Sequence, residues 1–157
     1  IALPSNNLSH LLTYQDAGAC FSRVADHLED NGLFVIDAFV PSLHLLTKNP
    51  DEEGILSEYD DPDRMGRGTV VTKSVYEQDT QIRRNTTIQR TDGVPEIVGH
   101  LNMRMYFPQE LEALLYYSGF EISERYGDSD HEPFSTTSSK QVIIAKKTNR
   151  PTRQCTQ

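Results

Sequence analysis

Residues 30–40, DNGLFVIDAFV, decide the fold class. The run from Leu33 to Val40 is almost continuously apolar, which is typical of a strand buried on both faces of a parallel sheet. Asn31-Gly32 precedes this run and predicts a helix end, because glycine tolerates the left-handed backbone that follows many helices. Apolar residues recur at helical spacing from Asp16 to Leu28. A helix, Asn-Gly and a buried strand form half of a β–α–β unit, so the sequence predicts an α/β fold.

The opening strand of that unit should lie before the helix. Only Ile1-Ala2-Leu3-Pro4 is available there, and the first residue is not Met. We therefore expect the chain to begin at the end of a strand and to be part of a longer protein.

Downstream of the buried strand, a short helix is predicted from Ser42 to Leu46. The next segment, Asp51 to Asp63, is rich in acidic residues and has no Lys or Arg. Such runs are typical of solvated loops. A metal site is the alternative, but the glycine and the spacing of a calcium loop are missing.

From Gly68 to Phe107 the apolar period changes to two. Turn signals at Gln78-Asp79 and Asp92-Gly93 divide this region, so we predict an antiparallel meander of three strands. A second helix is predicted from Pro108, with Gly119 closing it. The remaining predicted elements are strands over Phe120–Tyr126 and Gln141–Lys147 and a flexible tail over 148–157.

Composition excludes several classes of function. The 157 residues fit one domain, and a formal charge of -8 argues against nucleic acid as the main partner. No apolar run approaches the roughly 18–20 residues needed to span a bilayer. Cys20 and Cys155 do not form a disulfide framework, which favours a reduced, cytoplasmic setting.

Three phrases, taken in order, resemble class I S-adenosylmethionine-dependent methyltransferases. Residues 4–12, PSNNLSHLL, are similar to the family phrase P-F-N-S-L-x-H-L after the fourth strand. Residues 28–37 are similar to the family phrase L-x-x-G-G-x-x-x-x-D that leads into the fifth strand, with Asn31 in place of one Gly. Residues 106–120, YFPQELEALLYYSGF, resemble Y-x-P-x-E-L-x-x-L-L-x-x-A-G-F. The resemblance covers roughly residues 1–147.

The resemblance implies a truncated doubly wound sheet in which the final strand runs antiparallel between its neighbours. The meander, about 66–107, is similar to the insertion that covers the active site of small-molecule N-methyltransferases, including amino-sugar enzymes. Residues 1–147 would then be the C-terminal half of a methyltransferase domain, with S-adenosylmethionine as cofactor in the full-length protein.

The sequence also departs from the family pattern. The glycine-rich loop that receives the cofactor and the acidic residue that grips its ribose are absent, and Gly66-Arg67-Gly68 follows no buried strand. Ser5 stands where the family has Phe. The 157 residues alone therefore lack most of the expected cofactor site.

Candidate site residues follow from the resemblance. The predicted cofactor contacts at the end of the fourth strand are Pro4, Ser5 and Asn6. The predicted contacts of the methyl acceptor are His10, Arg83, Arg104 and Tyr106. For each residue a structural role is the alternative: a loop-capping amide for Asn6, a helix start for His10, and solvated strand faces for the meander residues. Asp37 is either a carboxylate at the mouth of the site or a hydrogen-bonded structural acid.

We assign no catalytic residue and no metal ligand, because methyl transfer mainly needs alignment of the reactants and exclusion of water. The first hypothesis is the C-terminal portion of a methyltransferase acting on a small molecule, an amine, and inactive as this chain alone. The alternative is a non-enzymatic interaction domain that self-associates through its open sheet edge. The expected partners are therefore the acceptor, together with the missing N-terminal half or a second copy of the chain, with neither nucleic acid nor membrane.

Overall fold

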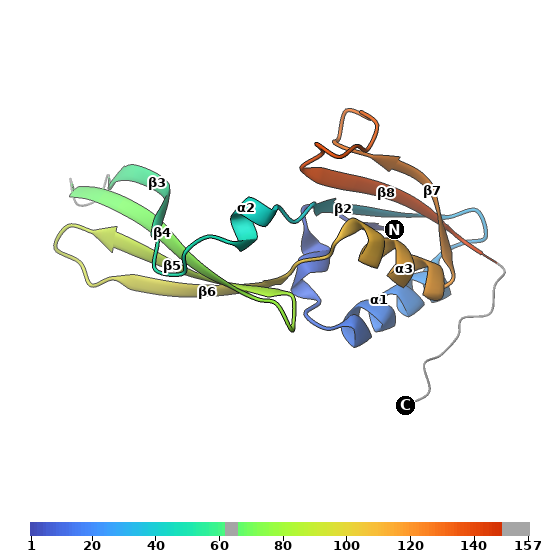
Figure 1. The fold of residues 1–157 in the computed structure, drawn as a ribbon, viewed down its shortest axis with the longest axis horizontal. Coiled ribbons are helices and arrows are strands. Elements are labelled where there is room, and N and C mark those ends of the chain that lie inside the picture. The colour runs from blue at the N-terminus through green and yellow to red at the C-terminus, as the bar shows by residue number, and fades with distance from the viewer. Residues whose placement is uncertain (62–65, 149–157) are drawn as a thin grey trace. The chain divides into compact units, whose positions relative to one another are not determined.

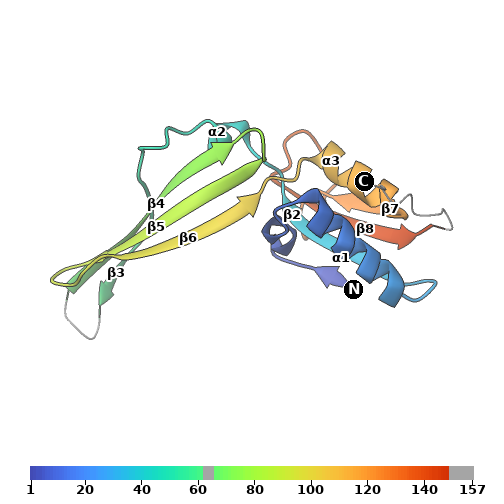
Figure 2. The ribbon, with the colours of Figure 1, turned by 90° about the horizontal axis from the view of Figure 1, so that it is seen from below.

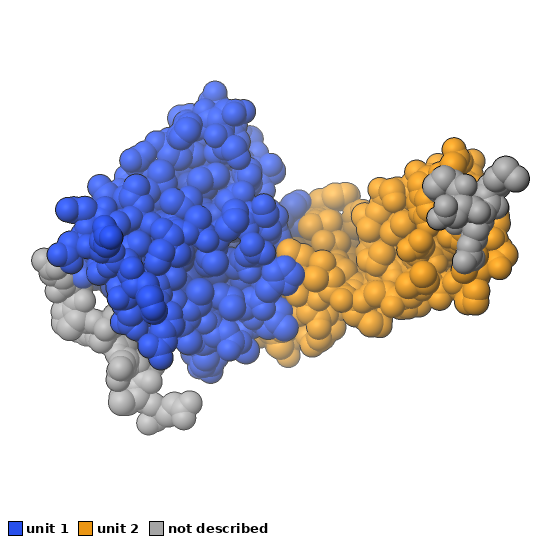
Figure 3. All heavy atoms as spheres, turned by 180° about the vertical axis from the view of Figure 1, so that it is seen from behind, with its two compact units in different colours: residues 1–42, 104–157 blue, residues 43–103 orange. Residues whose placement is uncertain are grey.

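The computed structural model describes residues 1–61 and 66–148, and the chain divides into two compact units. One unit contains residues 1–42 and the chain from Arg104 onward, and the other contains residues 43–103, as coloured in Figure 3. Cys155 and all of the predicted tail except Thr148 lie outside the described residues. Among the described residues, no helix combines the length and apolar character that crossing a membrane would require.

The first unit is an α/β sheet with two main helices (Figure 1). Its elements in chain order are β1 (Ala2–Leu3), η1 (Asn7–His10), α1 (Tyr14–His27), β2 (Leu33–Phe39), α3 (Pro108–Tyr117), β7 (Phe120–Tyr126) and β8 (Lys140–Lys147).

The strand order of this sheet is β1-β2-β8-β7. β1 pairs in parallel with β2, with Ala2 opposite Val35 and Leu3 opposite Ile36. β8 is antiparallel to both β2 and β7, so the predicted antiparallel last strand between its neighbours is confirmed. The α/β class is confirmed as well, with the parallel pair at one side of the sheet.

Helix α1 begins where Thr13 accepts a hydrogen bond from the Asp16 backbone N–H at 3.1 Å. After the helix, Gly32 has no positive φ, contrary to the left-handed role predicted for it. It is needed for a close approach instead, since a Cβ at Gly32 would lie 2.6 Å from Leu28 Cγ. Gly119 has φ 84 and does close α3 in the predicted way.

The core of the first unit lies between the sheet and the two helices. The Phe34 ring of β2 is 5.4 Å from that of Phe21 on α1 and 5.3 Å from that of Phe120 on β7, measured between centroids. All three rings are almost completely buried, and each such side chain contributes ~1.5–3 kcal/mol through burial. This packing fixes the amino end of β2 and the start of β7 against α1.

The second unit is an antiparallel sheet in the order β3-β4-β5-β6, which Figure 1 shows from top to bottom; Figure 2 shows the same strands from below. Its elements are α2 (Leu43–Leu46), β3 (Gly54–Asp61), β4 (Gly66–Glu77), β5 (Ile82–Thr91) and β6 (Ile97–Arg104), the last residue of which belongs to the first unit. The predicted turns at Gln78-Asp79 and Asp92-Gly93 are confirmed, and Gly93 has φ 72.

The prediction of a loop over the acidic segment was wrong, because its described part forms the edge strand β3 and makes the sheet four-stranded. Glu58 pairs with Thr69 and Tyr59 with Gly68 of β4. A Cβ at Gly68 would lie 2.3 Å from the Tyr59 ring, so the glycine makes room for the tyrosine. An edge strand keeps its acidic side chains in water while its backbone pairs on one side. Asp63 lies outside the described residues.

Candidate functional site

The predicted cofactor residues lie directly after β1, at the carboxyl end of the parallel strand pair. Ligands of α/β sheets bind at this edge. Ser5 and Asn6 both have left-handed backbone conformations, with φ 54 and 62. Such a conformation costs about 1–2 kcal/mol for a residue other than glycine, although Asn tolerates it better than most. Two consecutive residues with this backbone are rare in proteins generally, and strained residues of this kind are concentrated at functional sites.

Asn6 ties this loop to the end of β2. Its side-chain Oδ1 accepts a hydrogen bond from the Phe39 backbone N–H at 2.6 Å, and its own N–H donates to the Asp37 carbonyl at 3.0 Å. The amide side chain therefore has the capping function considered from the sequence. Pro4 and Ser5 are exposed at the same edge of the sheet.

Asp37 supports the loop from β2. Its carboxylate forms an ion pair with Lys140 at 3.0 Å and accepts a hydrogen bond from the Ser5 backbone N–H at 3.4 Å. Lys140 is the first residue of β8, so this ion pair joins the ends of two neighbouring strands. Asp37 is thus a bonded acid, as the structural alternative from the sequence predicted, and a functional role for its carboxylate stays a prediction.

The backbone at Leu11 and Leu12 is held by hydrogen bonds from Arg104 and Tyr106. Tyr106 is only 2% exposed, and its hydroxyl donates to the Leu11 carbonyl at 2.5 Å. Burial raises the pKa of Tyr106 above its ordinary value, so the phenol stays protonated and keeps donating. Arg104 donates to the Leu12 carbonyl at 3.2 Å and pairs with Glu110 at 2.8 Å. His10, just before this segment, is exposed.

Arg104 also lies over the Tyr106 ring, with Cζ 5.4 Å from the ring centroid. A guanidinium at this distance attracts the ring's π electrons and fixes its orientation. The structure therefore brings His10, Arg104 and Tyr106 together along one segment. The guanidinium of Arg104 and the hydroxyl of Tyr106 donate hydrogen bonds to backbone carbonyls of that segment.

Arg83 belongs to the second unit, on β5. It is half-buried and donates to the Ser74 hydroxyl at 3.0 Å. Burial lowers the pKa of its guanidinium, and among the described residues no carboxylate forms an ion pair with it. Its neighbour Arg84, in contrast, forms an ion pair with Glu77 at 2.5 Å.

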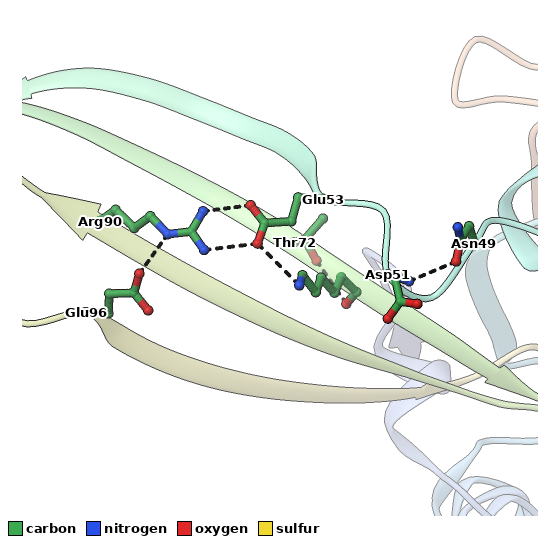
Figure 4. Close-up of polar contacts among 7 residues, drawn as sticks. Asn49, Asp51, Glu53, Thr72, Arg90 and Glu96 are labelled. Atoms are coloured by element: carbon green, nitrogen blue, oxygen red, sulfur yellow. Dashed lines mark hydrogen bonds and ion pairs between the residues drawn. The ribbon is translucent and has the colours of Figure 1, made fainter.

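Arg90, farther along β5, also has acidic partners. It bridges Glu53 at 2.7 Å and Glu96 at 2.8 Å, as Figure 4 shows. Lys73 adds a second cation to Glu53 at 3.4 Å. Hydrogen bonding to Arg90 is the main cause that lowers the pKa of Glu53 to about 2. Unlike Arg84 and Arg90 on the same strand, Arg83 is a partly buried cation that forms no ion pair within the described part of the chain.

One group of residues at this edge of the first unit was missed by the sequence reasoning. The connection between β7 and β8 forms an open pocket with a volume of about 480 Å³. Its lining residues are Val40, Pro108, Phe134, Ser135, Thr136 and Ser138. The available signal was a single aromatic residue, Phe134, before five consecutive Ser and Thr residues in an unusually long strand connection.

No group of three or more His, Cys, Asp or Glu side chains suited to a metal ion occurs among the residues that the structure describes. No protein-family model and no curated protein matches the chain.

Solved structures do match it. The CcbJ methyltransferase from Streptomyces caelestis superposes with a TM-score of 0.78 at 21% identity, covering 93% of this chain and 58% of that protein. CalS10, an amino pentose methyltransferase from Micromonospora echinaspora solved with S-adenosylmethionine bound, has a TM-score of 0.65 at 13% identity and covers 92% and 56%. The sugar N-methyltransferase KedS8 from Streptoalloteichus has a TM-score of 0.63 at 14% identity and covers 91% and 54%.

The chain thus spans little more than half the length of the solved structures that it matches. At these identities the likeness concerns the fold and leaves the activity open. The described residues have the fold of the class I S-adenosylmethionine-dependent methyltransferases.

Proposed function

We propose that the chain belongs to an S-adenosylmethionine-dependent methyltransferase that acts on a small-molecule amine. The observation that carries this proposal is the left-handed Ser5–Asn6 loop, bonded to the end of β2 in a sheet of methyltransferase fold. The loop lies at the edge where α/β sheets bind ligands. Strained backbone of this kind is concentrated at functional sites, which supports a ligand-binding role for the loop.

The residues present suit one side of the cofactor. When bound, S-adenosylmethionine would supply an electrophilic methyl group on its sulfonium, for attack by the nucleophile in line with the carbon–sulfur bond. Ser5 and Asn6 hold a backbone turn at the strand end, and Asp37 together with Lys140 keeps that turn in place. Such rigidity favours an in-line reaction, which depends mainly on orientation. The glycine-rich loop and the ribose-binding acid would come from residues outside these 157.

The acceptor side is assigned to the other predicted residues. His10 is exposed next to the Ser5–Asn6 loop and would orient the amine. Arg104 and Tyr106 fix the backbone after His10 and so position it, and their direct contact with the acceptor stays a prediction. Arg83 would take an anionic group of the acceptor, since it is half-buried and has no acidic partner in the described part of the chain. An amine on a sugar is compatible with the names of the matched proteins, an amino pentose methyltransferase and a sugar N-methyltransferase.

The remaining expected partner is a strand that would pair with β1 at the outer edge of the first sheet. Among the described residues β1 pairs with β2 alone, so its outer backbone groups are available to another strand. We propose that the rest of a methyltransferase fold pairs there, and that in its absence a second copy of the chain does so. Sedimentation of the purified 157-residue chain should then show a dimer. A well-behaved monomer would refute self-association.

The cofactor assignment is tested by titrating the 157-residue chain with S-adenosylmethionine while recording backbone amide resonances. Because these residues would contact one side of the cofactor, we expect weak but saturable shifts at Ser5, Asn6 and Phe39, and competition by S-adenosylhomocysteine. A matched titration with adenosine reports on contacts of the nucleoside alone. Self-association without any shift at these amides would overturn the proposal and favour the non-enzymatic interaction domain.

A further inference from the structure

The pocket between β7 and β8 is separate from the Ser5–Asn6 loop but lies at the same edge of the sheet. Val40 directly follows β2 and donates its N–H to the Ser139 carbonyl at 2.8 Å. Asn6 binds Phe39, the residue before Val40. The pocket and the loop therefore flank the same end of β2, one on the β8 side and the other on the β1 side.

The wall of the pocket is built by the chain's own hydrogen bonds. Gly127 donates its N–H to the Glu132 carbonyl at 2.7 Å, and Tyr126 forms an antiparallel bridge with Pro133. The Ser138 hydroxyl accepts from the Ser135 backbone N–H at 3.0 Å. A Cβ at Gly127 would lie 2.4 Å from this hydroxyl oxygen, so only glycine leaves room for it. A wall that is ordered before binding loses less conformational entropy when a ligand arrives.

Phe134 supplies an aromatic surface to the pocket, and its ring is contacted by the Arg125 guanidinium. The Arg125 guanidinium lies 5.2 Å from the centroid of the Phe134 ring. Arg125 is itself fixed by Glu112 at 3.3 Å, and its side chain is only 15% exposed. A cation covers one part of the ring, and the ring also lines the pocket, where it offers an apolar face.

The chemistry of the lining indicates the class of ligand. None of the six lining residues carries a charge: three are apolar and three bear hydroxyl groups. A volume of about 480 Å³ falls within the range of small-molecule pockets, ~300–1,000 Å³. An apolar ring face combined with hydroxyl groups complements a saturated ring that has an apolar side and several hydroxyls.

We propose that this pocket binds an uncharged, hydroxylated ring of the methyl acceptor, stacked on Phe134 and hydrogen-bonded by Ser135, Thr136 and Ser138. This inference rests on the proposed function, in which the acceptor lies at the carboxyl edge of the sheet. It assigns to the first unit the recognition of the acceptor's neutral ring.

The test is a titration of the 157-residue chain with methyl α-D-glucopyranoside, recorded by amide resonances. We expect saturable shifts at Phe134, Thr136 and Ser138. Phe134→Ala should weaken binding about fivefold through loss of stacking. Thr136→Val keeps the shape, removes one hydroxyl and should weaken binding roughly threefold. Tyr117→Ala removes an exposed aromatic ring from α3 outside the pocket and should leave the affinity unchanged.

Two comparison probes define the ligand class. Cyclohexanol has the ring without the set of hydroxyls, and glucose 6-phosphate adds a charge. Equal binding of cyclohexanol, tighter binding of the phosphate, or sugar-induced shifts confined to other residues would overturn the proposal. The S-adenosylmethionine titration reads Ser5 and Asn6 instead, so loss of the pocket proposal and loss of the proposed function are distinguishable.

Discussion

Replacing Gln141 by methionine should make the protein more stable. Gln141 lies on β8 opposite Ala38 and is completely buried. Neither its Oε1 nor its Nε2 has a hydrogen-bond partner among the described residues. Its neighbours on the same face of β8 are Ile143 and Ala145, both in the hydrophobic core. The amide therefore loses its contacts with water on folding and gains nothing in return.

The size of the effect follows from this environment. Leaving a buried amide unpaired costs ~1–3 kcal/mol. Methionine is unbranched and of similar length, so it fills the same space without a cavity. We expect Gln141→Met to raise the free energy of unfolding by about 1–2 kcal/mol, and the melting temperature by roughly 2–4 °C per kcal/mol for a chain of this size. Gln141→Ala removes the amide but leaves a cavity, and should lower stability instead.

The assay is urea unfolding, combined with hydrogen exchange at the Ile143 amide so that the first unit is read by itself. Gln109→Met on the exposed surface of α3 is the control and should stay within about 0.5 kcal/mol of the parent. A fall of more than about 1 kcal/mol for Gln141→Met, with Gln109→Met neutral, would refute the reasoning, because the amide would then have a partner in the native state.

Three further predictions concern both units. Asn6→Gly should lower the free energy of unfolding by about 1 kcal/mol through loss of the bond to Phe39, and Asn6→Ala by about 2 kcal/mol because alanine also resists the left-handed backbone; equal losses in urea unfolding would contradict the second contribution. Glu53 should titrate with a pKa of about 2 in the folded protein, and Arg90→Gln should return it towards 4.5. Because the folded pKa is the lower one, the Glu53 contribution is complete above 4.5 and is lost as the pH falls towards about 2; a carboxyl resonance of the parent protein with a midpoint near 4.5 would contradict this. Gly68→Ala should cost ~1–3 kcal/mol because its Cβ would meet the Tyr59 ring, and Tyr59→Leu should relieve most of that loss; additive losses in the double variant would exclude the clash.

Local patterns were sufficient for most of the elements. The helical spacing before Asn31-Gly32 predicted α1, and the apolar run after it predicted β2. The period of two predicted β4, β5 and β6, since alternation follows from the pleat of a strand. The left-handed glycine at Gly119 was also predictable, because a helix end has few backbone alternatives.

Other features depended on distant residues. The acidic composition of β3 predicted a loop, and only its pairing with β4 makes it a strand. Gly32 was predicted to adopt the left-handed backbone that ends a helix, whereas its close approach to the Leu28 side chain is what requires a glycine. In both cases the local structure depends on a residue that folding brings close. Composition alone does not show which residue that is.

The candidate site divides in the same way. The phrase around Ser5 and Asn6 pointed to the carboxyl end of a strand, and the structure places both residues there. The Phe134 pocket escaped prediction because its walls come from three separate parts of the chain.

By itself the sequence determined the α/β class, the helices α1 and α3, and the strands with strong apolar patterns. Tertiary structure alone decided that Tyr106 is buried against the Leu11 carbonyl and that Gln141 lies in the core with no partner in the described part of the chain. The physical reason is that periodicity and chain-reversing residues act within a few residues, whereas burial and hydrogen-bond partners depend on segments that meet only after folding.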